Sequence, residues 1–186
     1  MQEREPNPRV AEFLGKLAKL DAGDKAKLKR DAGKPLTEAQ SIGLFYRLLP
    51  YGLYAAQEET YFLVATLYPL AESGRAGNFG VSLRRARDPK NHKGLDRRIE
   101  VLLDSDTVQL NFRLRQAVRF LKSNRVKVNW QRLLEDLLWW NHANRFVQKQ
   151  WARAYFALPE KATRSDESHG LRGESRVNSA DPTQSA

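Results

Sequence analysis

Basic side chains gather in one stretch of this 186-residue chain, between residues 107 and 159. The only acids in the stretch are Glu135 and Asp136. Its lysines and arginines are Arg113, Arg115, Arg119, Lys122, Arg125, Lys127, Arg132, Arg145, Lys149 and Arg153. A surface of one sign repels itself and destabilises the folded state, so such an excess indicates a polyanionic partner that neutralises it. Phosphate groups of a nucleic acid are the commonest partner of this kind, and the stretch therefore predicts nucleic-acid binding.

The spacing of these residues suits helices. Arg115, Arg119 and Lys122 stand at i, i+4 and i+7, so a helix aligns them in one ridge. A second ridge of similar spacing consists of Arg145, Lys149 and Arg153. Charged helix positions are often no more than solvated faces, and that interpretation applies to either ridge alone. The near-absence of acids across both ridges favours phosphate contact.

Catalytic and metal-binding patterns are weak by comparison. The three histidines lack the spacing of a metal site; they are His92, His142 and His169, and the chain has no cysteine. A two-metal nuclease cluster could use Glu100, Asp104 and Asp106, but helix capping explains the two aspartates more simply. The glycine-rich string from Gly74 to Gly80 lacks the Lys-Ser/Thr of a phosphate-binding loop. We therefore expect no catalytic residues, no metal and no cofactor.

Composition indicates a folded protein of a reducing compartment. The net charge is +10, yet 41% of the residues are hydrophobic, which is enough to build a core. The absence of cysteine fits a reducing environment, and the first residues lack the apolar segment of a signal peptide. The longest apolar run, 61–71, is interrupted by Thr66 and Pro69 and falls short of the ~20 residues of a membrane span. We expect a cytoplasmic protein with no membrane partner.

Hydrophobic periodicity predicts an all-α fold. Asn7-Pro8 is a typical helix start, and Asp106 and Asn129 are further candidate N-caps. Apolar residues at helical spacing predict helices from Pro8 to Leu20 and over Lys25–Arg30, Thr37–Leu49, Glu58–Leu70, Leu95–Leu103 and Trp130–Trp140. In the helix over 37–49, Thr37 is the expected cap and Ile42, Phe45 and Leu49 are expected to face inward. The helix after Asp106 has one apolar face, formed by Leu110, Leu114, Val118 and Leu121. The last predicted helix passes through Phe146, Val147, Trp151 and Tyr155. Alternating strand patterns and internal repeats are absent from the sequence.

The tryptophans divide by position. Trp130 begins a predicted helix and Trp151 lies on an apolar helix face, so both are expected in the core. Trp139 and Trp140 are adjacent and point about 100° apart on a helix, so one of the two is expected to be exposed.

The predicted organisation is two small helical bundles, at 6–72 and 94–158. A Gly-rich loop and basic connector, 73–93, joins them. The segment 159–186 contains no aromatic residue and has a net charge of −1, which predicts a disordered tail that is dispensable for folding and assembly.

Three segments carry a family resemblance. They are Ile42–Gly52 (IGLFYRLLPYG), Phe79–Arg87 (FGVSLRRAR) and Val128–Trp140 (VNWQRLLEDLLWW). In this order they resemble the CasB family, the small subunit of the type I-E CRISPR surveillance complex Cascade. Ala26–Arg30 resembles a basic element of that family, with Lys29 replacing its first arginine. The resemblance extends from about Phe13 to Phe156 and does not include the tail.

The resemblance implies a non-enzymatic, all-helical subunit of two bundles. Its partners would be the CRISPR RNA-containing Cascade subunits, a second copy of the chain packed head to tail, and the target and non-target DNA strands of the R-loop that it stabilises. The positions that match the basic residues of the family are Lys29, Arg30, Arg47, Arg85 and Arg98.

The resemblance and the charge pattern together define a predicted nucleic-acid-binding set: Lys29, Arg30, Arg47, Arg84, Arg85, Arg87, Arg97, Arg98, Arg113, Arg115, Arg119, Lys122, Arg125, Arg145, Lys149 and Arg153. Two other classes of protein stay open. A free-standing, sequence-specific DNA-binding regulator would need a recognition helix aimed at base edges, which 135–145 does not clearly provide. An RNA-cleaving enzyme would need the acidic or histidine cluster that the pattern lacks.

Overall fold

A computed structural model describes residues 6–75 and 77–157, and within them the regular elements are helices joined by turns and loops. The elements are α1 (Pro8–Ala18), α2 (Ala22–Arg30), the 3-10 helix η1 (Leu36–Glu38), α3 (Ile42–Leu48), α4 (Ala55–Leu67), the 3-10 helix η2 (Tyr68–Leu70), α5 (Phe79–Arg85), α6 (Lys93–Leu103), α7 (Thr107–Ser123), α8 (Trp130–Leu137) and α9 (Phe146–Phe156). The described residues form no strand beyond one isolated bridge between Ser73 and Val128. The predicted all-α class is confirmed. No helix of the described residues is long and apolar enough to cross a membrane.

Side-chain caps start the helices where the sequence predicts. The Asn7 side chain accepts a hydrogen bond from the backbone N–H of Arg9 at the start of α1. The Asp106 carboxylate caps α7, and the Asn129 side chain caps α8 in the same way. Each cap satisfies a backbone donor that the first helical turn leaves without a partner.

The predicted helix over 37–49 is wrong in its first half. The chain is a short 3-10 turn at Thr37, which does not cap a helix, and α3 begins only at Ile42. The reason is Asp31, a fully buried carboxylate that accepts hydrogen bonds from the backbone N–H groups of Gln40 and Ser41. These bonds hold the chain extended before the helix. Ile42, predicted to face inward, is 48% exposed.

The hydrogen bonds to Asp31 also change its acidity. Burial alone would raise the pKa of Asp31, but the hydrogen bonds from Ser41, Lys34 and Gln40 outweigh burial, and the pKa is lowered. A carboxylate that is ionised inside the fold thus fixes the path of the chain between α2 and α3.

The segment predicted as a loop and basic connector contains a helix. α5 occupies Phe79–Arg85, with the Asn78 side chain as its N-cap, and it buries Phe79 and Leu83. The sequence signal is faint because the helix has seven residues and includes Gly80. Smaller differences concern the ends of helices: α4 begins at Ala55 and is followed by η2 from Tyr68, and α8 ends at Leu137.

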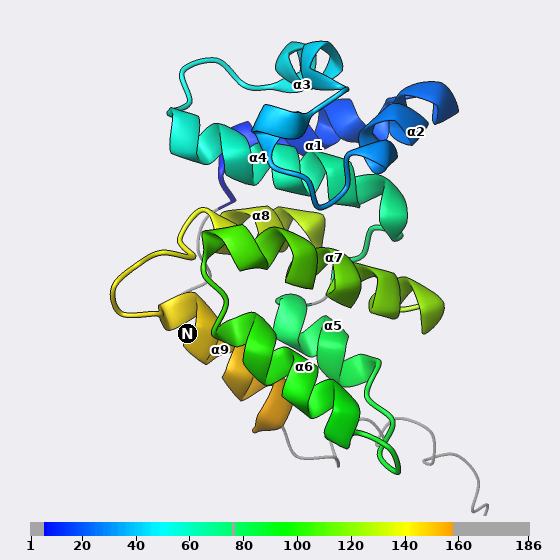
Figure 1. Cartoon of the computed structure of the whole chain (residues 1–186), viewed down its shortest axis with the longest axis vertical. Helices are drawn as coiled ribbons and strands as arrows, with labels where there is room; N and C mark the ends of the chain where they lie inside the picture. The colour runs from blue at the N-terminus through cyan, green and yellow to red at the C-terminus, as the bar shows by residue number, and fades with distance from the viewer. Residues whose placement is uncertain (1–5, 76, 158–186) are drawn as a thin grey trace, which may run out of the picture.

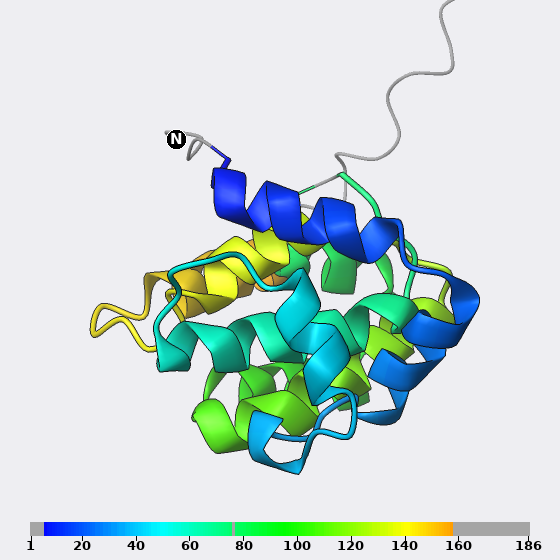
Figure 2. The same ribbon diagram turned by 90° about the horizontal axis from the view of Figure 1, so that it is seen from above.

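Figure 1 shows how the elements are arranged. α1–α4 lie at one end of the molecule, α5, α6 and α9 lie at the other, and α7 and α8 lie between them. Figure 2 shows α1, α2 and α3 around α4, whose residues 61–67 are all buried. α8 contacts α1 and α4, and α5 packs along α9. Helices of the two predicted bundles therefore pack directly on one another, and a boundary at 73–93 stays a prediction.

Candidate nucleic-acid interface

The two acids of the basic stretch are held in internal contacts. Glu135 Oε1 accepts hydrogen bonds from the backbone N–H of Asn7 (3.0 Å) and from the Gln131 side chain (3.2 Å). Asp136 is fully buried, accepts a hydrogen bond from Trp151 Nε1 (2.7 Å) and lies 3.0 Å from Arg132 Nε. Neither carboxylate is available to neutralise the basic residues on the surface.

A cleft of about 640 Å³ opens between η2 and the end of α7. Four cationic side chains line it: Lys25 of α2, Lys122 of α7, and Arg125 and Lys127 of the turn that follows α7. The acid on its wall is Glu72, which forms a 3.4 Å ion pair with Lys127. The cleft therefore carries a net positive charge, and its walls come from segments far apart in the sequence.

A second cleft, of about 330 Å³, adjoins the first. Its walls include Arg75 and Arg85, and it shares Arg125, Val126 and Lys127 with the larger cleft. The two hollows therefore meet at the turn after α7. We call the joined hollow the basic cleft and define it by Lys25, Arg75, Arg85, Lys122, Arg125 and Lys127.

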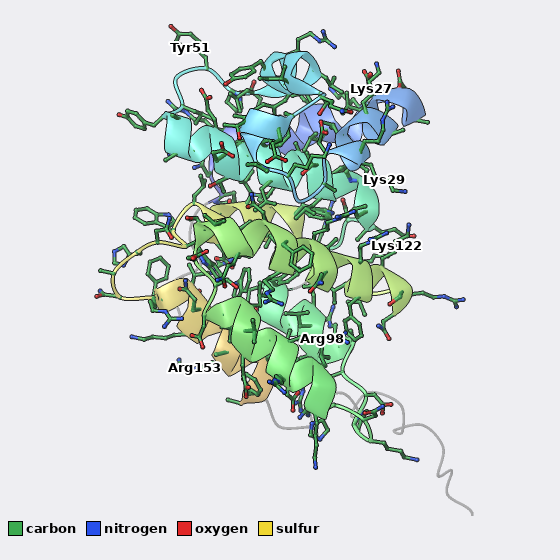
Figure 3. The ribbon with its side chains drawn as sticks, in the orientation of Figure 1. Lys27, Lys29, Tyr51, Arg98, Lys122 and Arg153 are labelled. Carbon is green, nitrogen blue, oxygen red and sulfur yellow. The ribbon has the colours of Figure 1, made fainter. Side chains whose placement is uncertain are left out.

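The ridge on α7 runs into the basic cleft. Arg119 and Lys122 are exposed, whereas Arg115 is half-buried and its aliphatic stem lies over Gly33. A β-carbon built on Gly33 would come within 2.8 Å of Arg115 Cδ. This contact brings the ridge beside the end of α2, where Lys29 is exposed. Figure 3 shows Lys29 and Lys122 along the same edge of the molecule.

Three arginines of the predicted set make contacts within the fold. Arg84 donates to the backbone carbonyl of Tyr155 (3.3 Å). Arg145 donates to the Leu103 carbonyl (2.7 Å) and to Asp104 (2.8 Å). Arg87 belongs to the network described next. Their roles in phosphate binding stay predictions, and these contacts give them structural roles as well.

The Arg87 network joins α6, α9 and the segment after α5 around one carboxylate. Asp96 of α6 accepts hydrogen bonds from Arg87 Nε (3.0 Å), Arg87 Nη2 (3.1 Å) and the Tyr155 hydroxyl of α9 (2.7 Å), and it lies 2.7 Å from His92 Nδ1. The Arg87 hydrogen bonds lower the pKa of Asp96 strongly, and the Tyr155 and His92 contacts add to this against the opposing effect of burial. Burial and the neighbouring carboxylate raise the pKa of the Tyr155 hydroxyl.

Other predicted residues lie away from the basic cleft. Arg98 of α6 and Arg153 of α9 are exposed on the half of the molecule that holds α5, α6 and α9 (Figure 3). The remaining members outside the cleft are Arg30, Arg47, Arg97 and Lys149, which are exposed, and Arg113, whose guanidinium lies 5.8 Å from the Phe112 ring centroid. The structure thus gathers only part of the predicted set into one hollow surface.

Sequence reasoning missed three residues of the basic cleft. Lys25, Arg75 and Lys127 were not in the predicted set, although each lines a wall. Backbone hydrogen bonds from Gly74 N to the Val128 carbonyl (2.8 Å) and from Val128 N to the Glu72 carbonyl (2.9 Å) bring Arg75 and Lys127 together. Lys25 reaches the cleft from α2, which packs against η2. A pairing across more than fifty residues leaves no local pattern to find. The acid-free stretch around Lys127 was the available signal.

Metal-binding clusters are absent from the part of the chain that the structure describes, where no three His, Asp or Glu side chains converge on one point. His92 lies in the Arg87 network, and His142 Nδ1 accepts a hydrogen bond from the Asn144 backbone. His169 and the predicted tail lie outside the described residues.

The fold and the basic cleft define an all-α protein with one strongly cationic surface. A family sequence model described as CRISPR-associated protein Cse2 matches residues 24–156. The chain therefore belongs to the Cse2 family, and the resemblance seen in the sequence is confirmed.

Individual relatives agree. The curated Cse2 of Thermus thermophilus is 34% identical over 154 residues, which cover 77% of this chain and 88% of that protein. The crystal structure of M. ruber CasB superposes with a TM-score of 0.69 at 27% identity, covering 82% of this chain and 94% of the other. The crystal structure of CasB from Thermus thermophilus superposes with a TM-score of 0.68 at 28% identity. The match covers 83% of this chain and 99% of that chain. A chain of a CRISPR RNA-guided surveillance complex shares the fold, with a TM-score of 0.67 at 24% identity over 79% of this chain and 91% of that one.

Proposed function

We propose that this chain is a non-enzymatic subunit of a type I-E CRISPR Cascade complex that stabilises the R-loop by binding nucleic acid in its basic cleft. Membership of the Cse2 family and the fold shared with a chain of an RNA-guided surveillance complex support the assembly. The observation that carries the binding role is the basic cleft, in which six cations surround one paired acid.

The chemistry of the cleft suits the phosphate backbone. Lysine and arginine at the wall of an open cleft neutralise phosphates without reading bases, so binding is independent of sequence. In RNA-guided recognition, base pairing with the guide supplies the specificity, and strand exchange is nearly balanced in free energy. A few phosphate contacts are then enough to favour the open R-loop. The other partners we propose are the CRISPR RNA-containing subunits, a second copy of the chain, and the target and displaced DNA strands.

Copurification tests the assembly directly. A tagged full-length chain, expressed with its Cascade neighbours, is expected to retain the other subunits together with CRISPR RNA. Purification of the tagged chain without other subunits would instead support a free-standing regulator. A preference for one duplex sequence in competition binding would support the same alternative. Metal-dependent cleavage of RNA by the purified chain would support the enzyme.

Charge reversal in the basic cleft tests the binding surface. Lys122→Glu and Arg85→Glu each change one wall, and both residues are exposed. We expect each to flatten the slope of log K against log salt for single-stranded DNA by about 0.7, because one phosphate contact is lost. Thermal melting is expected to stay close to that of the unmodified chain, since exposed substitutions change stability by about 0.5 kcal/mol at most.

Lys90→Glu is the matched control, because Lys90 is exposed in the turn before α6 and lines neither part of the cleft. It makes the same change in net charge. Equal losses from Lys90→Glu and Lys122→Glu would show that net charge rather than the cleft governs binding.

A further inference from the structure

The turn after α7 has an unusual residue at a position that normally requires glycine. α7 ends at Ser123, Asn124 is its C-cap, and Arg125 follows with φ of 57°, in the left-handed region. Arg125 N–H donates to the Lys122 carbonyl (3.0 Å), and Val126 N–H donates to the Leu121 carbonyl (2.9 Å). This pair of bonds is the Schellman motif, in which the left-handed residue is most often glycine because a side chain there is strained.

Elsewhere the described chain uses glycine for this backbone conformation. Gly33, Gly52 and Gly77 have φ of 83°, 75° and 62°, and the non-glycine exceptions among the described residues are Arg125 and Arg145. Both exceptions are arginines. A strained backbone conformation persists only where the surrounding structure holds it, and such residues cluster at functional sites.

Arg145 has a structural compensation. Its guanidinium donates to the Leu103 carbonyl (2.7 Å) and to the Asp104 carboxylate (2.8 Å), and so ties the start of α9 to the end of α6. These charge-assisted bonds offset the backbone strain within the fold itself.

Arg125 has no such compensation. Its side chain is exposed and makes no hydrogen bond or ion pair with any other residue that the structure describes. It lies where the two hollows of the basic cleft meet and lines both of them. Every cationic neighbour in the cleft repels its guanidinium, so the isolated chain is destabilised both by the backbone and by the charge.

We infer that Arg125 is a binding residue retained at the expense of stability: the left-handed turn projects its guanidinium into the junction of the basic cleft to contact the phosphate backbone of a single strand. This inference rests on the proposed function. It adds that Arg125 lowers the stability of the fold and at the same time strengthens nucleic-acid binding. Replacement by glycine should therefore raise the melting temperature and weaken nucleic-acid binding. Replacement of a left-handed arginine with no binding role would raise the melting temperature and leave binding unchanged.

The test compares Arg125→Gly with the full-length parent chain in thermal melting and in oligodeoxythymidine binding across a salt series. We expect Arg125→Gly to melt about 2–4 °C higher, as relief of a left-handed side chain predicts for a chain of this length. We expect the slope of log K against log salt to be about 0.7 shallower. Arg125→Lys keeps both the strain and the charge and is expected to match the parent in both measurements.

Arg145→Gly is the paired control, because it relieves the same kind of backbone strain but loses the hydrogen bonds to the Leu103 carbonyl and to Asp104. It is expected to melt no higher than the parent, because the two anchoring bonds are lost together with the backbone strain. Melting of Arg125→Gly at or below the parent temperature, or an unchanged salt slope with raised melting, overturns the inference. The salt dependence of the parent chain is measured first. Binding by the parent that does not change with salt overturns the proposed function itself, before any variant is compared.

Discussion

Asp96→Asn is expected to lower the free energy of unfolding by about 2–4 kcal/mol, measured by denaturant titration. The Asp96 carboxylate accepts both Arg87 hydrogen bonds and the hydrogen bond of the Tyr155 hydroxyl, and so links α6 to α9 and to the segment that follows α5. Tyr155 is fully buried and only 16% of the Arg87 side chain is exposed. An amide cannot satisfy these donors as a carboxylate does, and it leaves the guanidinium without its counter-charge.

The same substitution should reduce the dependence of stability on pH. The pKa of Asp96 is lowered in the folded protein, so its contribution is complete above the unfolded pKa of about 3.9 and is lost as pH falls toward the folded value. The unfolding free energy of the parent chain should therefore fall below about pH 4 more steeply than that of Asp96→Asn. Asp31, whose pKa is also lowered, preserves part of the acid sensitivity in the variant.

Asp104→Asn provides a matched control for this prediction. Asp104 also pairs with an arginine at 2.8 Å, but 74% of its side chain is exposed. An exposed pair contributes about 1 kcal/mol or less. Equal destabilisation by the two variants would contradict a special role for the Asp96 network.

Features that depend on local sequence patterns, such as helix caps and buried helix faces, could be predicted from the sequence. Helical periodicity placed Leu110, Leu114, Val118 and Leu121 on one face, and all four are buried. It also divided the tryptophans correctly: Trp130 and Trp151 are buried, Trp140 is 3% exposed, and its neighbour Trp139 is 50% exposed. Caps and periodicity act within one or two turns of a helix, which is why they could be read without a structure.

Long-range contacts explain what the sequence could not show. Asp31 redirects the chain ten residues later, at Ser41, and so delays α3. Arg87 was predicted to bind nucleic acid from its charge, and the carboxylate that it contacts in the fold, Asp96, lies nine residues away on α6. The basic cleft depends on the backbone pairing of Gly74 with Val128. In each case the partner is set by tertiary packing, which charge and spacing along the chain do not encode.

The last expected result concerns Gly80, within the segment FGVSLRRAR that carried the family resemblance. The basic residues of that segment suggested a binding motif, yet its glycine serves packing. A β-carbon built on Gly80 would overlap the Trp151 carbonyl oxygen and lie 2.9 Å from the Trp151 Cα. The neighbouring atoms are backbone of α9, which cannot move aside as a flexible side chain does. α5 and α9 can therefore pack this closely only if position 80 has no side chain.

Gly80→Ala is accordingly expected to destabilise the fold by about 3 kcal/mol or more, at the upper end of the range for overpacked cores. Helix propensity alone predicts the opposite sign, since alanine is favoured over glycine within a helix by about 1 kcal/mol. Gly15→Ala, in α1, isolates that propensity because nothing lies within 4 Å of its new β-carbon, and it should stabilise by about 0.5–1 kcal/mol. Opposite signs for the two variants in urea unfolding would assign Gly80 to the contact between α5 and α9. A stabilising Gly80→Ala would show that the helices separate without penalty, and the glycine would then need another explanation.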